Sequence, residues 1–265
     1  MTEFEQNAKR FSEIASVYDE ARPAMPEALP RIVRNYLGGK PGRVLDLGCG
    51  TGLSTAVWRG LCAQAIGIEP NEEMLRLARE KEAEGLFFLH AFSHEIPLPG
   101  ASVDAIICSQ SFHWMQIPET LREAGRLLRD GGLFAAVDYD WPPVCAPRVE
   151  RAYQAMIDRV KALQSADLEL RDPFTRADKS AHLEALQKSR VFSYVRELYF
   201  MNEEGCSRER LLGMAKSQGG LSRILSLRPE MVKKELSELD RAVEESYGGA
   251  DFRVSFCYRL RLGLK

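Results

Sequence analysis

The sequence predicts an α/β fold: a Rossmann-like, doubly wound and mostly parallel sheet with helices on both faces, an N-terminal helical segment and an inserted helical cap. Three observations lead to this prediction. Short apolar runs alternate with helical periodicity over about the first 140 residues. The apolar run that ends at Leu47 enters a loop with glycine at every second position. Glu69 closes the next apolar run, where a sheet of this kind holds a ribose by its hydroxyls.

The glycine loop narrows the class of ligand. Its glycines, Gly48, Gly50 and Gly52, permit sharp turns and close approach of a ligand to the backbone, and a helix is predicted from about Gly52. Leu53 stands where a dinucleotide fingerprint has its third glycine. The loop holds no Lys or Arg, which excludes a P-loop, and Asp46 would repel a pyrophosphate while suiting a cationic or amino-bearing ligand.

The remaining elements follow in order along the chain. Asn71 is a predicted N-cap after the second strand, and Asp130-Gly131-Gly132 is a turn into the fifth. Trp141-Pro142-Pro143 stops the alternation, and about fifty mostly helical residues follow. Later helices are predicted around 208–218 and 230–245. Further strands are predicted at 65–69, 87–89, 104–109, 133–137, 194–200 and 254–260.

Several motifs together resemble one enzyme family. The loop Asp46–Gly52 with Glu69 resembles motif I and the second strand of class I S-adenosylmethionine-dependent methyltransferases. His94-Glu95-Ile96-Pro97-Leu98 is similar to the family's "E-x-L-P-F" loop, and Ser111-Phe112-His113-Trp114 to its "A-L-H-W". The run from Phe11 to Pro23 resembles its "F-x-x-x-A-x-x-Y-D-x-x-R-P" entry. The likeness covers about the first 140 residues and is greatest to type 11 methyltransferases of the trans-aconitate methyltransferase kind.

This resemblance implies S-adenosyl-L-methionine as the cofactor. Where the family has Gly-Asp before the "E-x-L-P" loop this chain has Ala91-Phe92, so adenine is expected to be held by stacking and backbone contacts near Phe92 and Ser93. The expected cofactor-binding residues are Tyr18, Arg22, Asp46, Gly48, Gly50, Gly52, Glu69, Pro70, Met74, Phe92, Ser93, Ser109 and His113.

Methyl transfer from a sulfonium chiefly requires that donor and acceptor be aligned and water excluded. His113 is the candidate general base, because it follows the fourth strand and can titrate near neutrality; alternatively it packs the start of the next helix. Trp114, Tyr139 and Trp141 are candidate substrate residues. No metal site is expected: His90 and His94 lack a third ligand nearby.

Asp138 and Asp140 are interpreted as solvated turn residues or as part of the acceptor pocket. The expected organisation is an N-terminal helical segment (1–30), a Rossmann-like domain (31–140 and 191–265) and a substrate cap (141–190) that packs over the strand ends. Such a lid would admit a small-molecule acceptor, for which a carboxylate is one option.

Composition sets the broader limits. The 265 residues carry a net charge of −2, which gives no electrostatic reason for nucleic-acid or membrane binding. Six scattered cysteines without C-x-x-C spacing are expected to be reduced core residues, with the cytoplasm as the natural compartment. A monomer or a homodimer is expected. Two other function classes remain open. One is a catalytically silent, cofactor-binding regulatory module. The other is an NAD(P)-dependent oxidoreductase, although Leu53 and Asp46 in and before the glycine loop disfavour it.

Overall fold

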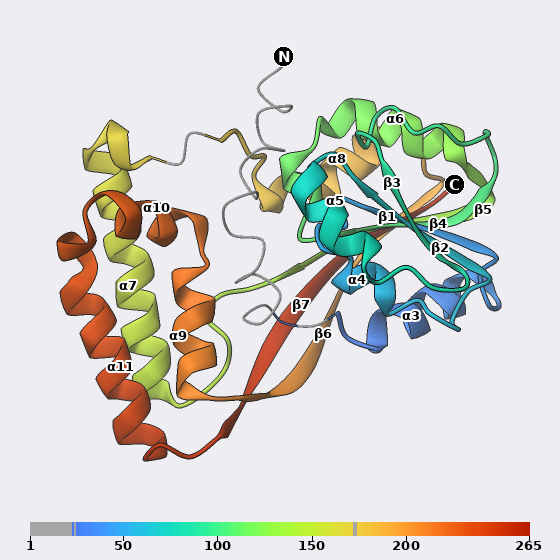
Figure 1. The fold of residues 1–265 in the computed structure, drawn as a ribbon. Coiled ribbons are helices and arrows are strands. Elements are labelled where there is room, and N and C mark those ends of the chain that lie inside the picture. Colours follow the sequence, from blue (N-terminus) through green and yellow to red (C-terminus); the bar gives the residue numbers. More distant parts are fainter. Residues whose placement is uncertain (1–22, 24, 172–173) are drawn as a thin grey trace.

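The computed structural model describes residues 23, 25–171 and 174–265. Most of the expected N-terminal helical segment, with Tyr18 and Arg22, therefore lies outside the described residues. Seven strands form one sheet in the order β3-β2-β1-β4-β5-β7-β6 (Figure 1). The strands are β1 (Arg43–Leu47), β2 (Gln64–Glu69), β3 (Leu86–His90), β4 (Val103–Ser109), β5 (Leu128–Tyr139), β6 (Tyr194–Cys206) and β7 (Phe252–Leu264).

The sheet is mostly parallel, as the sequence predicts. Strands β1 to β5 pair in parallel with their neighbours, whereas β7 runs antiparallel to both β5 and β6. A dinucleotide-binding sheet has the order 3-2-1-4-5-6, without such an inserted strand. The antiparallel strand therefore separates this sheet from that of the nicotinamide-dependent dehydrogenases.

Alternate residues of each parallel strand face two separate cores. On one face Val44 and Ala105 pack with α3 (Ala28–Leu37) and α5 (Glu72–Arg79). On the other face Leu45 and Ile106 pack with α6 (Ile117–Leu127) and α8 (His182–Lys188). Successive side chains of a strand point to opposite faces, so a strand buried on both sides reads as a continuous apolar run. Helices on both faces make the sheet doubly wound.

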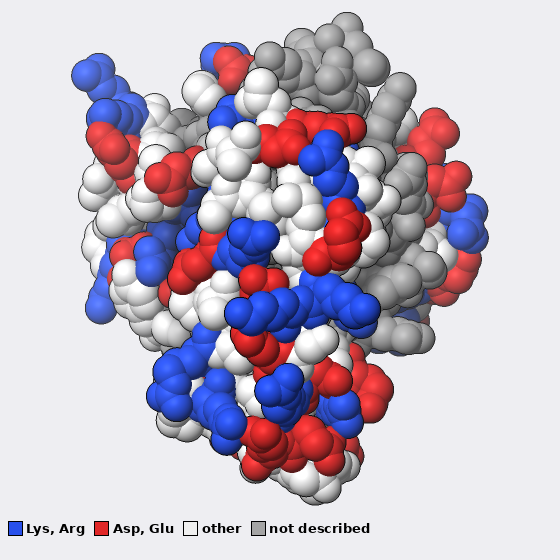
Figure 2. All heavy atoms as spheres, turned by 90° about the vertical axis from the view of Figure 1, so that its left-hand side faces the viewer, with Lys and Arg blue, Asp and Glu red and all other residues white. Residues whose placement is uncertain are grey.

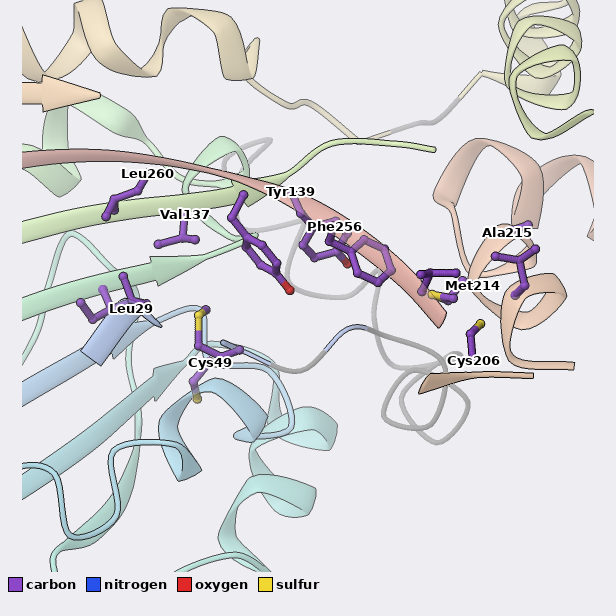
Figure 3. Close-up of a cluster of buried hydrophobic side chains, with 14 of the residues drawn as sticks. Leu29, Cys49, Val137, Tyr139, Cys206, Met214, Ala215, Phe256 and Leu260 are labelled. Carbon is purple, nitrogen blue, oxygen red and sulfur yellow. The ribbon is translucent and has the colours of Figure 1, made fainter. Parts of the chain in front are cut away.

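A second group of helices lies beyond one end of the sheet. It consists of α7 (Pro147–Ala166), α9 (Arg208–Lys216), α10 (Gly219–Leu227) and α11 (Lys233–Tyr247), with the one-turn helix η4 (Pro229–Val232). The long strands β6 and β7 run from the sheet towards these helices (Figure 1). The apolar core follows the same path: Tyr139 and Phe256 connect Val137 and Leu260 in the sheet with Met214 and Ala215 of α9 (Figure 3).

The expected cap, 141–190, contributes to two places in the fold. Helix α7 packs against α10 and α11, whereas α8 lies against β6 and β7. Between them are the short helices η2 (Leu168–Leu170) and η3 (Lys179–Ala181). None of the described residues from 142 to 190 lines the principal cavity, so the role of this segment as a substrate cap stays a prediction. Among the described helices, none is long and apolar enough to span a membrane.

Candidate active site

The principal cavity lies at the carboxyl ends of β1, β2 and β4. Its walls come from the glycine loop after β1, the end of β2, the loop after β3 and the segment after β4. From β1 the chain crosses to β2 on one side, while β4 pairs on the other, so the cavity sits where the strand order reverses. Open α/β sheets bind their ligands at this place.

The three loop glycines are required for two different reasons. All have positive φ, which L side chains rarely adopt. A Cβ on Gly48 would lie 2.7 Å from Cβ of Ser111, and one on Gly52 would lie 2.7 Å from the Phe88 ring. A Cβ on Gly50 would meet no atom within 4 Å, and Gly50 lines the cavity. Gly48 and Gly52 thus allow close packing of the protein on itself, whereas Gly50 leaves its space to a ligand.

Glu69 projects into the same place from the end of β2. Its Oε2 accepts a hydrogen bond from the backbone N–H of Gly50 (2.9 Å), and its Oε1 accepts one from that of Asn71 (2.9 Å). A carboxylate offers about four acceptor positions, so two remain for a ligand that donates. Burial raises the pKa of Glu69 to about 7, although the two backbone hydrogen bonds oppose the shift. The residue is 7% exposed and lines the cavity.

Asp46 supports the loop from inside the protein. It is fully buried, and its Oδ2 accepts hydrogen bonds from the hydroxyls of Ser54 (2.6 Å) and Thr55 (2.7 Å). Burial raises its pKa to about 6, which these two hydrogen bonds partly offset. The helix predicted from Gly52 is a single turn, α4 (Leu53–Ala56), so it adds little dipole to the site. Asp46 is not among the described residues that line the cavity, which differs from its expected contact with the ligand.

The loop after β3 forms a second wall. Phe92 and Ser93 both line the cavity, as does His94, whose ring lies 5.6 Å from that of Phe92. The Ser93 hydroxyl is 2.7 Å from that of Thr120 on α6, which fixes the loop against this helix. A flat ring system could stack on Phe92 here, so the arrangement fits the expected recognition of adenine without an acidic residue.

The segment after β4 forms the opposite wall. Ser109, Gln110 and Trp114 line the cavity there, and Trp114 ends the one-turn helix η1 (Phe112–Trp114). Tyr139 at the end of β5 and Tyr258 of β7 complete this aromatic side. The antiparallel pairing places Tyr258 opposite Tyr139, with their ring centroids 5.6 Å apart. No local sequence signal marked Tyr258, because its position depends on a strand pairing between distant segments.

His113 lies away from the cavity. It is 5% exposed, its Nδ1 is 3.8 Å from Asp138 Oδ1, and its ring stacks near His182. Burial, reinforced by the charge of Lys179, lowers the pKa of His113 to about 2. An imidazole with so low a pKa is a poor proton acceptor at neutral pH. The structure therefore agrees with the packing alternative for His113 and not with a base at the mouth of the site.

Asp138 is the centre of a buried charged cluster. Its carboxylate lies 2.9 Å from Lys179 Nζ, 2.9 Å from Arg261 and 3.3 Å from His182 Nδ1. Burial would raise the pKa of Asp138, but the contacts with His182 and Lys179 outweigh it and hold that pKa below its usual value. The interpretation of Asp138 as a solvated turn residue is wrong, because β5 continues to Tyr139 and Arg261 on β7 supplies a buried counter-charge.

The structure thus brings most of the predicted residues together. The predicted residues that line the cavity are Gly48, Gly50, Glu69, Pro70, Met74, Phe92, Ser93, Ser109, Trp114 and Tyr139. Asp46, Gly52 and His113 lie behind it, and Trp141 stacks on Tyr153 within the apolar core. In the part of the chain that the structure describes, no group of three His, Cys, Asp or Glu side chains is arranged to hold a metal ion.

Comparison with known proteins places this site in a family. Residues 45–136 match a family model described as a methyltransferase domain. These residues belong to that methyltransferase domain family. The match runs from β1 to β5 and so includes the glycine loop, Glu69, Phe92 and the segment after β4.

Curated proteins similar to this chain are also named as methyltransferases. An uncharacterised methyltransferase of Mycobacterium bovis is 35% identical over 129 residues, covering 48% of this chain and 51% of the relative. A malonyl-[acyl-carrier protein] O-methyltransferase of Serratia marcescens is 29% identical over 127 residues, covering 48% and 49%. The chain spans about half the length of the curated relatives it matches.

A solved structure extends the likeness in fold beyond the methyltransferase domain. A candidate type II methyltransferase from Anaeromyxobacter dehalogenans superposes with a TM-score of 0.70 at 24% identity, covering 92% of this chain and 97% of that one. The shared fold therefore includes the helices beyond the sheet. At this identity the comparison concerns the fold alone.

Proposed function

We propose that this protein transfers a methyl group from S-adenosylmethionine to a small-molecule acceptor. The observation that supports this proposal best is the pairing of Gly50 with Glu69. A glycine whose Cβ position is open faces the cavity, and a carboxylate with spare acceptor positions stands beside it. A nucleoside needs both features, because its ribose donates two hydroxyls and lies against the loop backbone.

The residues of the two walls would have different roles in binding. Glu69 would accept hydrogen bonds from the ribose, the loop around Gly50 would carry the methionyl part, and Phe92 would stack on the adenine. Bound S-adenosylmethionine supplies an electrophilic methyl group. Trp114, Tyr139 and Tyr258 would orient the acceptor on the opposite wall and exclude water from it. A strongly basic side chain is not required for a reaction governed by alignment.

Calorimetry tests the cofactor assignment directly. We expect S-adenosylmethionine and its demethylated product S-adenosylhomocysteine to bind with micromolar affinity, which corresponds to about −8 kcal/mol. NAD is the control ligand, because the dehydrogenase alternative requires it. Binding of NAD together with no heat from either sulfonium-derived ligand would refute the methyltransferase proposal.

Phe92→Ala tests the adenine wall. Removing the ring should weaken S-adenosylhomocysteine binding about 10-fold, since base–aromatic stacking contributes about 1–3 kcal/mol. Phe87→Ala is the matched control: Phe87 lies on β3 but is 43% exposed and does not line the cavity. Equal affinities of the two variants and the wild type would mean that adenine is held by other residues.

The acceptor is proposed to be of metabolite size, with a carboxylate as one option. A malonyl-[acyl-carrier protein] O-methyltransferase among the relatives supports an oxygen acceptor on a carboxylic acid. Figure 2 shows Lys and Arg interspersed with Asp and Glu on the face towards the helices beyond the sheet. Such a mixture offers no extended basic surface for a nucleic acid on that face.

Two alternatives make different predictions. A silent regulatory module would bind S-adenosylmethionine yet methylate nothing in labelled metabolite pools analysed by mass spectrometry. An NAD(P)-dependent oxidoreductase is disfavoured by the antiparallel β7 between β5 and β6, in addition to Leu53 in the glycine loop.

A further inference from the structure

The side chain of Gln110 is oriented by the buried charged cluster around Asp138. Gln110 follows β4 directly and lines the cavity. Its Oε1 accepts a hydrogen bond from Lys179 Nζ (2.9 Å), and the same ammonium lies 2.9 Å from Asp138 Oδ1. An ammonium can donate but cannot accept, so the amide must turn its oxygen towards Lys179. The amide nitrogen of Gln110 is thereby directed away from Lys179.

The amide nitrogen has an unused capacity to donate. Within the described part of the chain, Nε2 of Gln110 is buried and has no hydrogen-bond partner. Buried polar groups are nearly always paired, so an unpaired donor on a residue that lines the cavity calls for an explanation. The backbone adds a second observation: Gln110 has φ of +54°, while its N–H donates to Val137 O (2.9 Å). Residues other than glycine in this conformation cluster at ligand-binding sites.

We propose that Gln110 selects the methyl acceptor by donating a hydrogen bond from Nε2 to a carbonyl or carboxylate oxygen of that acceptor. This inference rests on the proposed function, because it assigns the wall opposite the cofactor. Lys179 holds the amide oxygen, which leaves the amide nitrogen free to donate, so an oxygen with free lone pairs fits better than an ammonium group.

The neighbouring residues narrow the acceptor further. Trp114, Tyr139 and Tyr258 line the cavity on the same side and suit a flat, apolar group next to the oxygen. A carboxylate is already ionised at neutral pH, so no residue has to remove a proton from it. The low pKa of His113 is compatible with such an acceptor.

The test uses cinnamate and cinnamylamine as probes of equal length. Each is titrated into the full-length protein saturated with S-adenosylhomocysteine, and binding is measured by calorimetry. We expect the wild-type complex to bind cinnamate at least 10-fold more tightly than the amine. Gln110→Met should lose about 10-fold in affinity for cinnamate, as one hydrogen bond to a charged group implies, while the affinity for S-adenosylhomocysteine stays within twofold.

Gln110→Glu tests whether the preference between the two probes can be inverted, which loss of structure would not do. Its carboxylate would pair with Lys179 and present an oxygen to the ligand, so the preference should reverse in favour of cinnamylamine. Gln187→Met, on the exposed side of α8, is the matched control and should alter the affinity for neither probe.

Each outcome bears on a separate claim. Unchanged binding of cinnamate to Gln110→Met, or equal binding of both probes to the wild type, would overturn the role of Gln110. Failure of both probes to bind a complex that holds S-adenosylhomocysteine would overturn the acceptor class and leave the cofactor assignment intact. Failure of S-adenosylhomocysteine itself to bind would instead refute the proposed function.

Discussion

Gly50→Val is expected to abolish binding of S-adenosylhomocysteine while the protein still unfolds cooperatively. The valine side chain would extend into the cavity, because the Cβ position of Gly50 is open and faces the proposed ligand. The dissociation constant measured by calorimetry should rise more than 100-fold, which corresponds to about 3 kcal/mol.

A matched control separates lost space from backbone strain. Gly50 has φ of +57°, so a branched residue is strained there whatever the space around it. Gly60 has φ of +74°, also has no atom within 4 Å of its Cβ position, and is exposed away from the cavity. Gly60→Val should therefore lower the unfolding temperature by a similar amount and leave ligand binding intact. Equal loss of binding in both variants would contradict the placement of the ligand against Gly50.

Glu69→Gln is expected to weaken S-adenosylhomocysteine binding about 10- to 100-fold. Hydrogen bonds to a charged acceptor contribute about 1.5–3 kcal/mol, and the amide of glutamine has half the acceptor capacity and no charge. Glu72→Gln is the matched control, since Glu72 is exposed in the first turn of α5 and does not line the cavity. Calorimetry gives the affinities, and thermal unfolding shows whether the loop contacts with Gly50 and Asn71 survive. An affinity equal to that of the wild type would mean that the ribose is bound elsewhere.

The raised pKa of Glu69 predicts that the affinity for the ligand depends on pH. Burial raises the pKa of Glu69 to about 7 in the protein without ligand, and hydroxyl groups that donate to the carboxylate favour its charged form. Binding should therefore release a proton, and affinity should fall as the pH drops through 7. Titrations in buffers of different ionisation enthalpy measure that proton, and Glu69→Gln should remove it. Asp46, whose pKa burial raises to about 6, is unchanged in Glu69→Gln. It therefore serves as the reference for any pH dependence that does not come from Glu69.

The sequence predicted those parts of the site that depend on local chain geometry. Gly48, Gly50 and Glu69 lie where expected, because a strand that ends in a glycine loop fixes its own neighbours. The parallel strands were equally predictable, since both faces of the sheet are apolar. The one-turn length of α4 was not, because the helical pattern after Gly52 gave no sign of where it ends.

The parts that could not be predicted depend on contacts between distant segments. Asp138 is buried because Arg261 and Lys179, more than 40 residues away in the chain, supply its counter-charges. His113 faces that cluster and not the cavity for the same reason. Nothing near Gln110 in the sequence indicates that Lys179 orients its amide.

The antiparallel strand β7 has a consequence for the order of folding. Strand β6 joins the sheet through β7, which the chain reaches only after α9, α10 and α11 have been made. The parallel core from β1 to β5 can form without either strand, whereas β6 has to wait for a partner about 45 residues further along the chain. Until then the edges of β5 and β6 are open to pairing with other chains. We therefore expect the chain to be most prone to aggregation, and to bind chaperones most, after β6 has been synthesised and before β7 pairs with it.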